Sequence, residues 1–193
     1  MLKRKSAGLL LVSALLAVAA LTAGSASAGK PSPTLTCTGV VNGGPAWGNV
    51  VVPNGAECTL NGVTVLGSVS VGVDSELYVS GGSIHGNLSA FESFDVETGG
   101  GVGPSHIYGN VTIDSSFETL FDSTIDGNAS FTNNHLVILQ TPSHVGGNVR
   151  INDNDIVNIF NLIVGGNLGC SGNGVVNPLN ATVTGHRSGQ CAV

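Results

Sequence analysis

The chain has 193 residues, of which 41% are hydrophobic and only 9% are charged. Residues 29–193 hold all 12 acidic side chains but only Lys30, Arg150 and Arg187 among the basic ones, a formal charge of −9 with neutral His. This balance argues against nucleic acid and anionic membrane surfaces as partners, because binding to both needs clustered Lys and Arg. Apolar residues run throughout these positions, so the composition also argues against a disordered chain and favours one domain.

Residues 1–28 have the organisation of a secretion signal. A basic start at Lys3–Lys5 precedes an apolar stretch over residues 9–21, and small residues follow as far as Ala28. The apolar stretch is short for a membrane anchor. We therefore expect export to the extracellular space and a mature chain, residues 29–193, that has no membrane span.

The four cysteines indicate how the ends of the mature chain are held. We expect an N-terminal cap over residues 29–47 and a C-terminal cap over residues 185–193. Three pairings are possible, but equal separations of 21 residues, one near each end, favour two short-range disulfides. Each would contribute about 3 kcal/mol by loop closure; the alternative is two buried pairs of free thiols. The favoured bonds join Cys37 to Cys58 and Cys170 to Cys191.

A repeat of about 19 residues covers residues 48–184. A glycine recurs at intervals of 18 to 23 residues and is usually followed by Asn. From Val65 onward, side chains two residues before the glycine are β-branched, and those two and four residues after it are mostly apolar, with polar residues between them. This period of two predicts strands, about three in each repeat. The glycines are Gly48, Gly67, Gly86, Gly109, Gly127, Gly147, Gly166 and Gly185.

A repeat this short cannot bury its apolar side alone, so successive repeats must stack on one another. We therefore predict an all-β fold, a parallel β-helix or solenoid of about eight turns, with adjacent turns about 4.8 Å apart. The glycine would permit a corner that a Cβ hinders. The Asn that follows it would form a hydrogen-bonded structural ladder along the axis. Its members are Asn49, Asn87, Asn110, Asn128, Asn148 and Asn167.

One repeat reads His106-Ile107-Tyr108-Gly109-Asn110-Val111-Thr112-Ile113. This pattern, which covers almost the whole mature chain, resembles small secreted right-handed parallel β-helix proteins of Gram-positive bacteria. It is more distantly similar to the cores of pectate-lyase-like enzymes and of bactofilin-type polymer-forming proteins. The resemblance implies a single-stranded, right-handed solenoid, whereas left-handed hexapeptide helices keep a strict six-residue period that these intervals lack. The pattern identifies an architecture and says little about activity.

An acidic file lies nine residues after the glycine in four successive repeats. Carboxylates stacked about 4.8 Å apart would repel one another, so something should relieve the repulsion. One hypothesis is a row of calcium ions, because calcium prefers several oxygen ligands. The alternative is that the acids extend into solvent and keep the protein soluble. The proposed metal ligands are Glu57, Glu76, Asp95 and Glu118.

Other files of equivalent residues suggest surface and core roles. Phe94 and Phe117 fall at equal offsets in adjacent repeats, which predicts a core stack rather than a sugar-binding platform. The glycine-rich residues 98–105 predict a loop that bulges from one turn. Interior positions are also predicted for Phe121, Phe131 and Phe160. A file of hydroxyls that could bind glycans or ice contains Ser70, Ser89, Thr112 and Ser130.

The sequence favours a non-catalytic exported β-solenoid that serves as a structural or matrix-binding module. Its expected partner is a polysaccharide or another cell-envelope component, and we expect a monomer with no cofactor other than calcium.

Two alternatives stay open. The resemblance to pectate-lyase-like proteins suggests a polysaccharide lyase or hydrolase, but the available acids, His135 and Arg150 follow no catalytic motif, so no catalytic residue is assigned. The resemblance to polymer-forming β-helices suggests end-to-end assembly, since open solenoid ends expose unpaired strand edges. The acids considered for catalysis are Asp114, Asp122 and Asp126.

Overall fold

The computed structural model describes residues 33–192 with gaps at 45, 141–142 and 178–179, and leaves the side chains of residues 118–120 undescribed. The expected secretion signal, residues 1–28, and the start of the expected N-terminal cap lie outside the described residues. The described part of the chain contains strands β1 to β23 and no helix, and therefore no helix that could cross a membrane. The predicted all-β class is confirmed.

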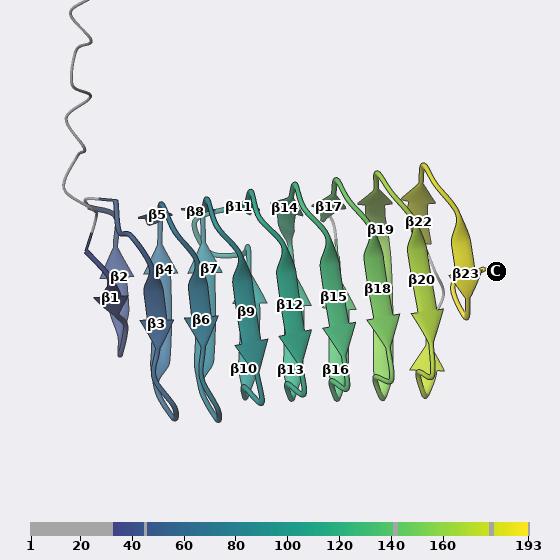
Figure 1. Cartoon of the computed structure of the whole chain (residues 1–193), viewed down its shortest axis with the longest axis horizontal. Helices are drawn as coiled ribbons and strands as arrows, with labels where there is room; N and C mark the ends of the chain where they lie inside the picture. The colour runs from purple at the N-terminus through teal and green to yellow at the C-terminus, as the bar shows by residue number, and fades with distance from the viewer. Residues whose placement is uncertain (1–32, 45, 141–142, 178–179, 193) are drawn as a thin grey trace, which may run out of the picture. The chain divides into compact units, whose positions relative to one another are not determined.

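The strands form three parallel faces, which we name A, B and C. Figure 1 shows the A-face strands in front, with the chain descending along each one and passing behind at the bottom. It then rises along the B and C faces and steps toward the C-terminal end, so the winding is right-handed. The result is the predicted parallel β-solenoid of about eight turns with a spacing of about 19 residues.

Each turn contributes one short strand to each face, and β19 runs without a break across the B and C faces. The A face contains β1 (Leu35–Thr36), β3 (Val50–Val52), β6 (Val69–Val71), β9 (Leu88–Phe91), β12 (Val111–Asp114), β15 (Ala129–Thr132), β18 (Val149–Asn152), β20 (Leu168–Ser171) and β23 (Arg187–Gly189). The B face contains β2 (Val40–Asn42), β4 (Glu57–Asn61), β7 (Glu76–Ser80), β10 (Asp95–Thr98), β13 (Glu118–Phe121), β16 (Leu136–Leu139), the first part of β19 (Ile156–Val164) and β21 (Val175–Val176). The C face contains β5 (Thr64–Val65), β8 (Ser83–Ile84), β11 (Ser105–Ile107), β14 (Ser123–Ile125), β17 (His144–Val145), the second part of β19 and β22 (Asn180–Val183).

Strand pairing joins equivalent residues of successive turns. Ile107 pairs with Ile84 of the preceding turn and with Ile125 of the following turn, as the glycine alignment predicts. All three side chains are buried. Files of this kind from the three faces fill the interior, because alternate residues of a strand point to opposite sides of a sheet.

The aromatic residues divide between the core and the surface. Phe121 and Phe131 are buried as predicted and meet edge to face, with ring centroids 5.3 Å apart. The interior prediction is wrong for Phe94, Phe117 and Phe160, which are 52%, 52% and 49% exposed. Phe160 lies outside because it directly follows the buried Ile159 in β19, where alternate residues point to opposite sides of the sheet.

The glycine file lies where successive turns approach most closely. A Cβ on Gly109 would sit 2.3 Å from the carbonyl oxygen of Gly86, which leaves no room for a side chain. Beside it, the Asn87 Oδ1 accepts a hydrogen bond from the backbone N–H of Asn110, at 2.8 Å. The same bond recurs along the exposed asparagine file as far as His186, so each side chain joins its own turn to the next.

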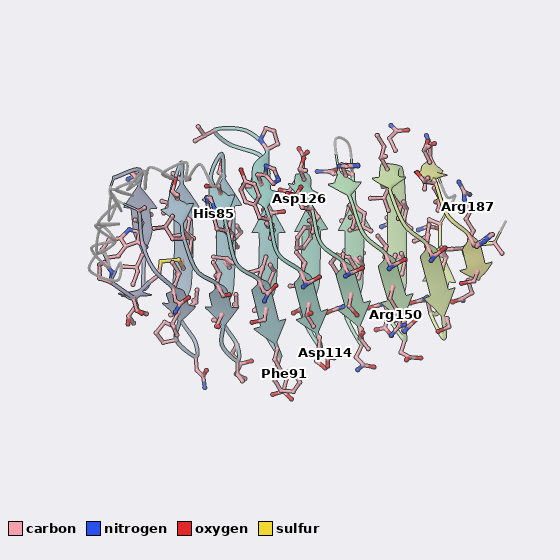
Figure 2. All side chains as sticks on the ribbon, turned by 45° about the horizontal axis from the view of Figure 1, so that its top comes forward. His85, Phe91, Asp114, Asp126, Arg150 and Arg187 are labelled. Atoms are coloured by element: carbon pink, nitrogen blue, oxygen red, sulfur yellow. A yellow bond between two sulfur atoms is a disulfide. The ribbon has the colours of Figure 1, made fainter. Side chains whose placement is uncertain are left out.

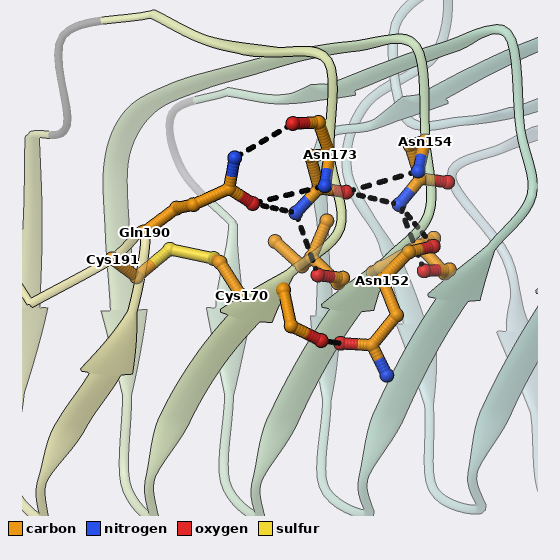
Figure 3. The surroundings of a disulfide bond; sticks show 9 residues. Asn152, Asn154, Cys170, Asn173, Gln190 and Cys191 are labelled. Carbon is orange, nitrogen blue, oxygen red and sulfur yellow. Dashed lines mark hydrogen bonds between the residues drawn. A yellow bond between two sulfur atoms is a disulfide. The ribbon is translucent and has the colours of Figure 1, made fainter.

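A second amide ladder lies in the interior at the corner between the A and B faces (Figure 3). The Asn154 Oδ1 accepts from the backbone N–H of Asn134 at 2.9 Å, and the Asn173 Oδ1 accepts from the backbone N–H of Asn154 at 3.0 Å. The ladder ends at Gln190, whose Oε1 accepts from the backbone N–H of Asn173 at 2.9 Å. Ser116 extends it in the other direction, since its backbone N–H donates to Asn134.

The two disulfides lie at opposite ends of the solenoid and have the expected partners. Cys37–Cys58 and Cys170–Cys191 have Cα separations of 5.5 and 5.3 Å, and all four residues are buried. At the C-terminal end, the inward file that includes Leu168 finishes with Arg187. The Arg187 guanidinium donates to the carbonyl oxygen of Ala181 on the C face.

Candidate ligand-binding groove

The corner between the A and B faces turns one file of side chains outward. Glu92 and Ser115 have left-handed backbone conformations, with φ of 51° and 60°. In the turns that carry them, the next residue points inward and the one after it, Phe94 or Phe117, points outward. Backbone hydrogen bonds hold the turns together here, as between the N–H of Phe117 and the carbonyl of Ser93 at 3.2 Å.

Three rings from successive turns are stacked in this outward file. The ring centroids of Phe94 and Phe117 are 5.3 Å apart with planes 7° from parallel. Those of Phe117 and His135 are 4.9 Å apart at 19°. In the next turn Asp155 continues the file, and its Oδ2 lies 2.9 Å from the His135 Nδ1. The file therefore ends in an exposed histidine–carboxylate pair.

An open groove of about 620 Å³ runs beside these rings. We name it the ring groove and define it by Phe94, Phe117 and His135 together with the carboxylates Asp74, Glu92 and Asp155, all of which line it. Neither Lys nor Arg is among its lining residues.

The ring groove combines two chemistries that suit a sugar. Ring edges and faces offer apolar surface to the C–H groups of a pyranose, while carboxylate and Ser115 oxygens can accept hydrogen bonds from its hydroxyls. Exposed stacked rings gain little from folding, because much of their surface stays in water. The rings therefore contribute little to the core, and their position makes them a candidate binding surface.

The polar A face offers a shallower alternative surface. The hydroxyl file Ser70, Ser89, Thr112 and Ser130 is in register, and Arg150 follows it in the next turn. Two open depressions of about 480 and 550 Å³ lie along it and share Asn128 and Ser130. This face carries hydrogen-bonding groups at each turn, but neither depression is lined by an aromatic side chain. Phe91 lines a third, smaller depression of about 240 Å³ on the same face.

The acidic file has the expected backbone register on the B face. Glu57, Glu76, Asp95 and Glu118 are paired in successive strands. The Tyr78 hydroxyl donates to the Glu76 Oε2 at 2.9 Å, which relieves part of the repulsion. Burial, and then hydrogen bonds and charge from Glu76 and Asp95, raise the pKa of Tyr78 above its usual value.

Calcium binding by the acidic file stays a prediction. Among residues 33–192, where described, no three His, Cys, Asp or Glu side chains converge as a metal site, and the side chain of Glu118 is not described. Calorimetric titration of the protein with calcium tests the prediction directly.

The residues considered for catalysis are not brought together. Asp126 pairs with His106 at 2.9 Å on the C face, whereas Asp114 accepts from Ser115 and Asn133 at the edge of the A face. Figure 2 shows Asp126 and Asp114 at opposite margins of the solenoid, with Arg150 apart from both. His135 lies in the ring groove. The corners of each turn separate these residues, so they do not form one cluster.

Asp122 lies at the corner between the B and C faces, between β13 and β14. One carboxyl oxygen is buried and has no hydrogen-bond partner among the described residues. Burial raises the pKa of this carboxyl above its usual 3.8.

A second group of rings lies on the C face near Asp126. The Tyr108 ring stacks with His106, at a centroid distance of 4.0 Å, and with His85 of the preceding turn, at 4.6 Å. This cluster was not predicted from the sequence. The sequence feature that could have indicated it is the spacing from the repeat glycine: Tyr108 and His85 each stand one residue before a glycine, and His106 stands three before.

The ring groove was also missed, although the equal offsets of Phe94 and Phe117 were visible. Phe94 has the same parity as the buried Val96, so a period of two predicts the interior. The corner at Ser93 breaks that parity and turns the ring outward. Comparisons of this chain with protein-family models, with curated proteins and with solved structures found no match.

Proposed function

We propose that the protein is an exported, non-catalytic β-solenoid that binds polysaccharide through the ring groove. The observation that carries this proposal is the stack of Phe94, Phe117 and His135, in which both phenylalanines are 52% exposed beside an open groove. The expected signal sequence and two buried disulfides are compatible with an extracellular, cell-envelope or matrix setting.

The geometry also suits a linear ligand. Equivalent side chains repeat about every 4.8 Å along the axis, so a polymer lying parallel to the axis meets the same kind of contact at successive turns. The three ring-bearing turns span about 9.6 Å between the outer two. A rigid β-solenoid holds such contacts in place before binding, which limits the entropy lost when the ligand docks.

The test is retention of the protein on insoluble polysaccharides, followed by affinity measurements with soluble fragments of any polymer that retains it. Phe117→Ala removes the central ring and should weaken binding about tenfold, the effect of losing a central aromatic contact. Phe160→Ala is the matched control, because Phe160 is similarly exposed but lies outside the ring groove.

Circular dichroism of both variants checks that the solenoid remains folded. Equal losses of affinity in the two variants would overturn the proposal, as would the absence of retention on a broad panel of neutral, acidic and cationic polysaccharides.

A further inference from the structure

The ring groove holds carboxylates at both ends of its ring stack. Asp74 and Glu92 lie at the end near Phe94, and Asp155 lies beyond His135 at the other end. In the described part of the chain, the Lys and Arg side chains are Arg150 and Arg187. Neither lines the groove, so no fixed positive charge there offsets the carboxylates.

A comparison between turns shows that the corner does not itself require these acids. Asp74 and Glu92 occupy the left-handed residue of their corners, with φ of 53° and 51°. Gly55 and Gly172 occupy that place in other turns, and glycine adopts this conformation without strain. The left-handed corner position can therefore be occupied by glycine, but in these two turns beside the groove it is occupied by an acidic residue.

The carboxylates recognise cations, and the rings add apolar contact. An ammonium group forms charge-assisted hydrogen bonds with carboxylates, while the stacked rings of Phe94, Phe117 and His135 present mainly their apolar edges to a sugar beside them. A pyranose that bears a free amino group presents both an apolar face for the rings and a positive charge for the acids. Neutral sugars offer the carboxylates only uncharged hydroxyl donors, which form weaker hydrogen bonds, and acidic sugars are repelled by the carboxylates.

We propose that the ring groove selects polysaccharides built from amino sugars with free, protonated amino groups. This inference rests on the proposed function and names its ligand class. The groove binds such a polymer with Phe94 and Phe117 against the sugar and with Asp74, Glu92 and Asp155 paired to its ammonium groups.

The experiment titrates the disulfide-bonded protein with a glucosamine hexamer and with the N-acetylglucosamine hexamer, at a pH where the free amines are protonated. The first should bind at least about tenfold more tightly, and raising the salt from about 0.01 M to about 0.15 M should reduce that difference. Combined Asp74→Asn and Glu92→Gln substitutions leave Asp155 in place, so they should remove most, but not all, of the difference in affinity between the two hexamers.

The matched control is Glu57→Gln with Glu97→Gln, which removes two negative charges from the B face and should leave the difference unchanged. Equal affinities for the two hexamers, both weakened by Phe117→Ala, would overturn the inference and leave the proposed function standing. Failure of both hexamers and of all other glycans to bind would overturn both. A hexalysine peptide that binds as tightly as the glucosamine hexamer would also overturn the inference, since charge alone would then suffice.

Discussion

The chain builds two ladders of the same amide chemistry, one on its surface and one in its interior. The surface ladder, from Asn87 to Asn167, is exposed to water along its length, and its Oδ1 atoms accept backbone N–H groups of the following turn. In the interior ladder, from Asn134 to Gln190, each side-chain oxygen accepts instead from a backbone N–H of the preceding turn. Its members Asn134, Asn154 and Asn173 are buried.

The difference teaches what burial adds to an identical bond. Water can replace a lost partner on the surface, but no water is at hand in a packed interior, where an unsatisfied amide bears its full desolvation cost. The interior ladder should therefore govern stability at the corner where the ring groove lies, while the surface ladder should contribute mainly to alignment of the turns.

The largest effect is expected from Asn154→Ala. This change leaves the backbone N–H of Asn134 and the carbonyl oxygen of Phe131 without the partners they have now. Two buried groups that lose their hydrogen bonds should lower the free energy of unfolding by about 3 kcal/mol. Urea unfolding followed by circular dichroism measures the change. Asn154→Ser is the control, since Ser116 and Ser93 occupy the same file, and it should lose less.

A smaller effect is expected from Asn128→Ala in the surface ladder. The side chain accepts from the backbone N–H of Asn148 at 2.8 Å, but both residues are exposed. Water can take over the bond, so the free energy of unfolding should fall by about 1 kcal/mol or less. The same urea experiment compares it directly with Asn154→Ala. Equal losses in the two variants would contradict the distinction between the ladders.

The smallest effect is expected from Asp122→Asn, and it depends on pH. Burial raises the pKa of Asp122 in the folded protein above 3.8, so the folded state holds this proton more tightly than the unfolded state. The contribution of Asp122 to the free energy of unfolding is therefore fully present below pH 3.8 and is lost as the pH rises through its raised pKa in the folded protein. Asp122→Asn should remove that loss and flatten the profile of unfolding free energy above pH 3.8. A steeper decline in the variant would show that the carboxylate is stabilising when charged.

Much of the fold could be predicted because every turn must stack on its neighbours with equivalent residues in register. The Gly-Asn step marks the close approach of turns, and the β-branched residue before it marks the interior, so Ile84, Ile107 and Ile125 fall into register. The equal cysteine separations favoured the two disulfides for a related reason, since each bond joins neighbouring turns at one end.

The corners resisted prediction because two-residue alternation fails there. Asn154 follows Asp153, whose φ is 56°, and this left-handed residue sends the amide into the interior although its neighbours are polar. The corner at Glu92 has the opposite consequence for Phe94, which alternation assigns to the core. Both the interior ladder and the ring groove follow from this break in alternation, so one kind of local geometry made both the buried amides and the candidate binding groove hard to predict.

Arg187 also sets a limit on how the molecule can change length. Turns in the middle present the same pairing edge on both sides, so an additional copy of the repeat inserted between β15 and β18 would find matching neighbours on each. A copy appended after β23 would instead have to displace a guanidinium from Ala181 and accommodate it in an apolar interior. We therefore expect the solenoid to tolerate a repeat inserted between its middle turns better than one added after β23.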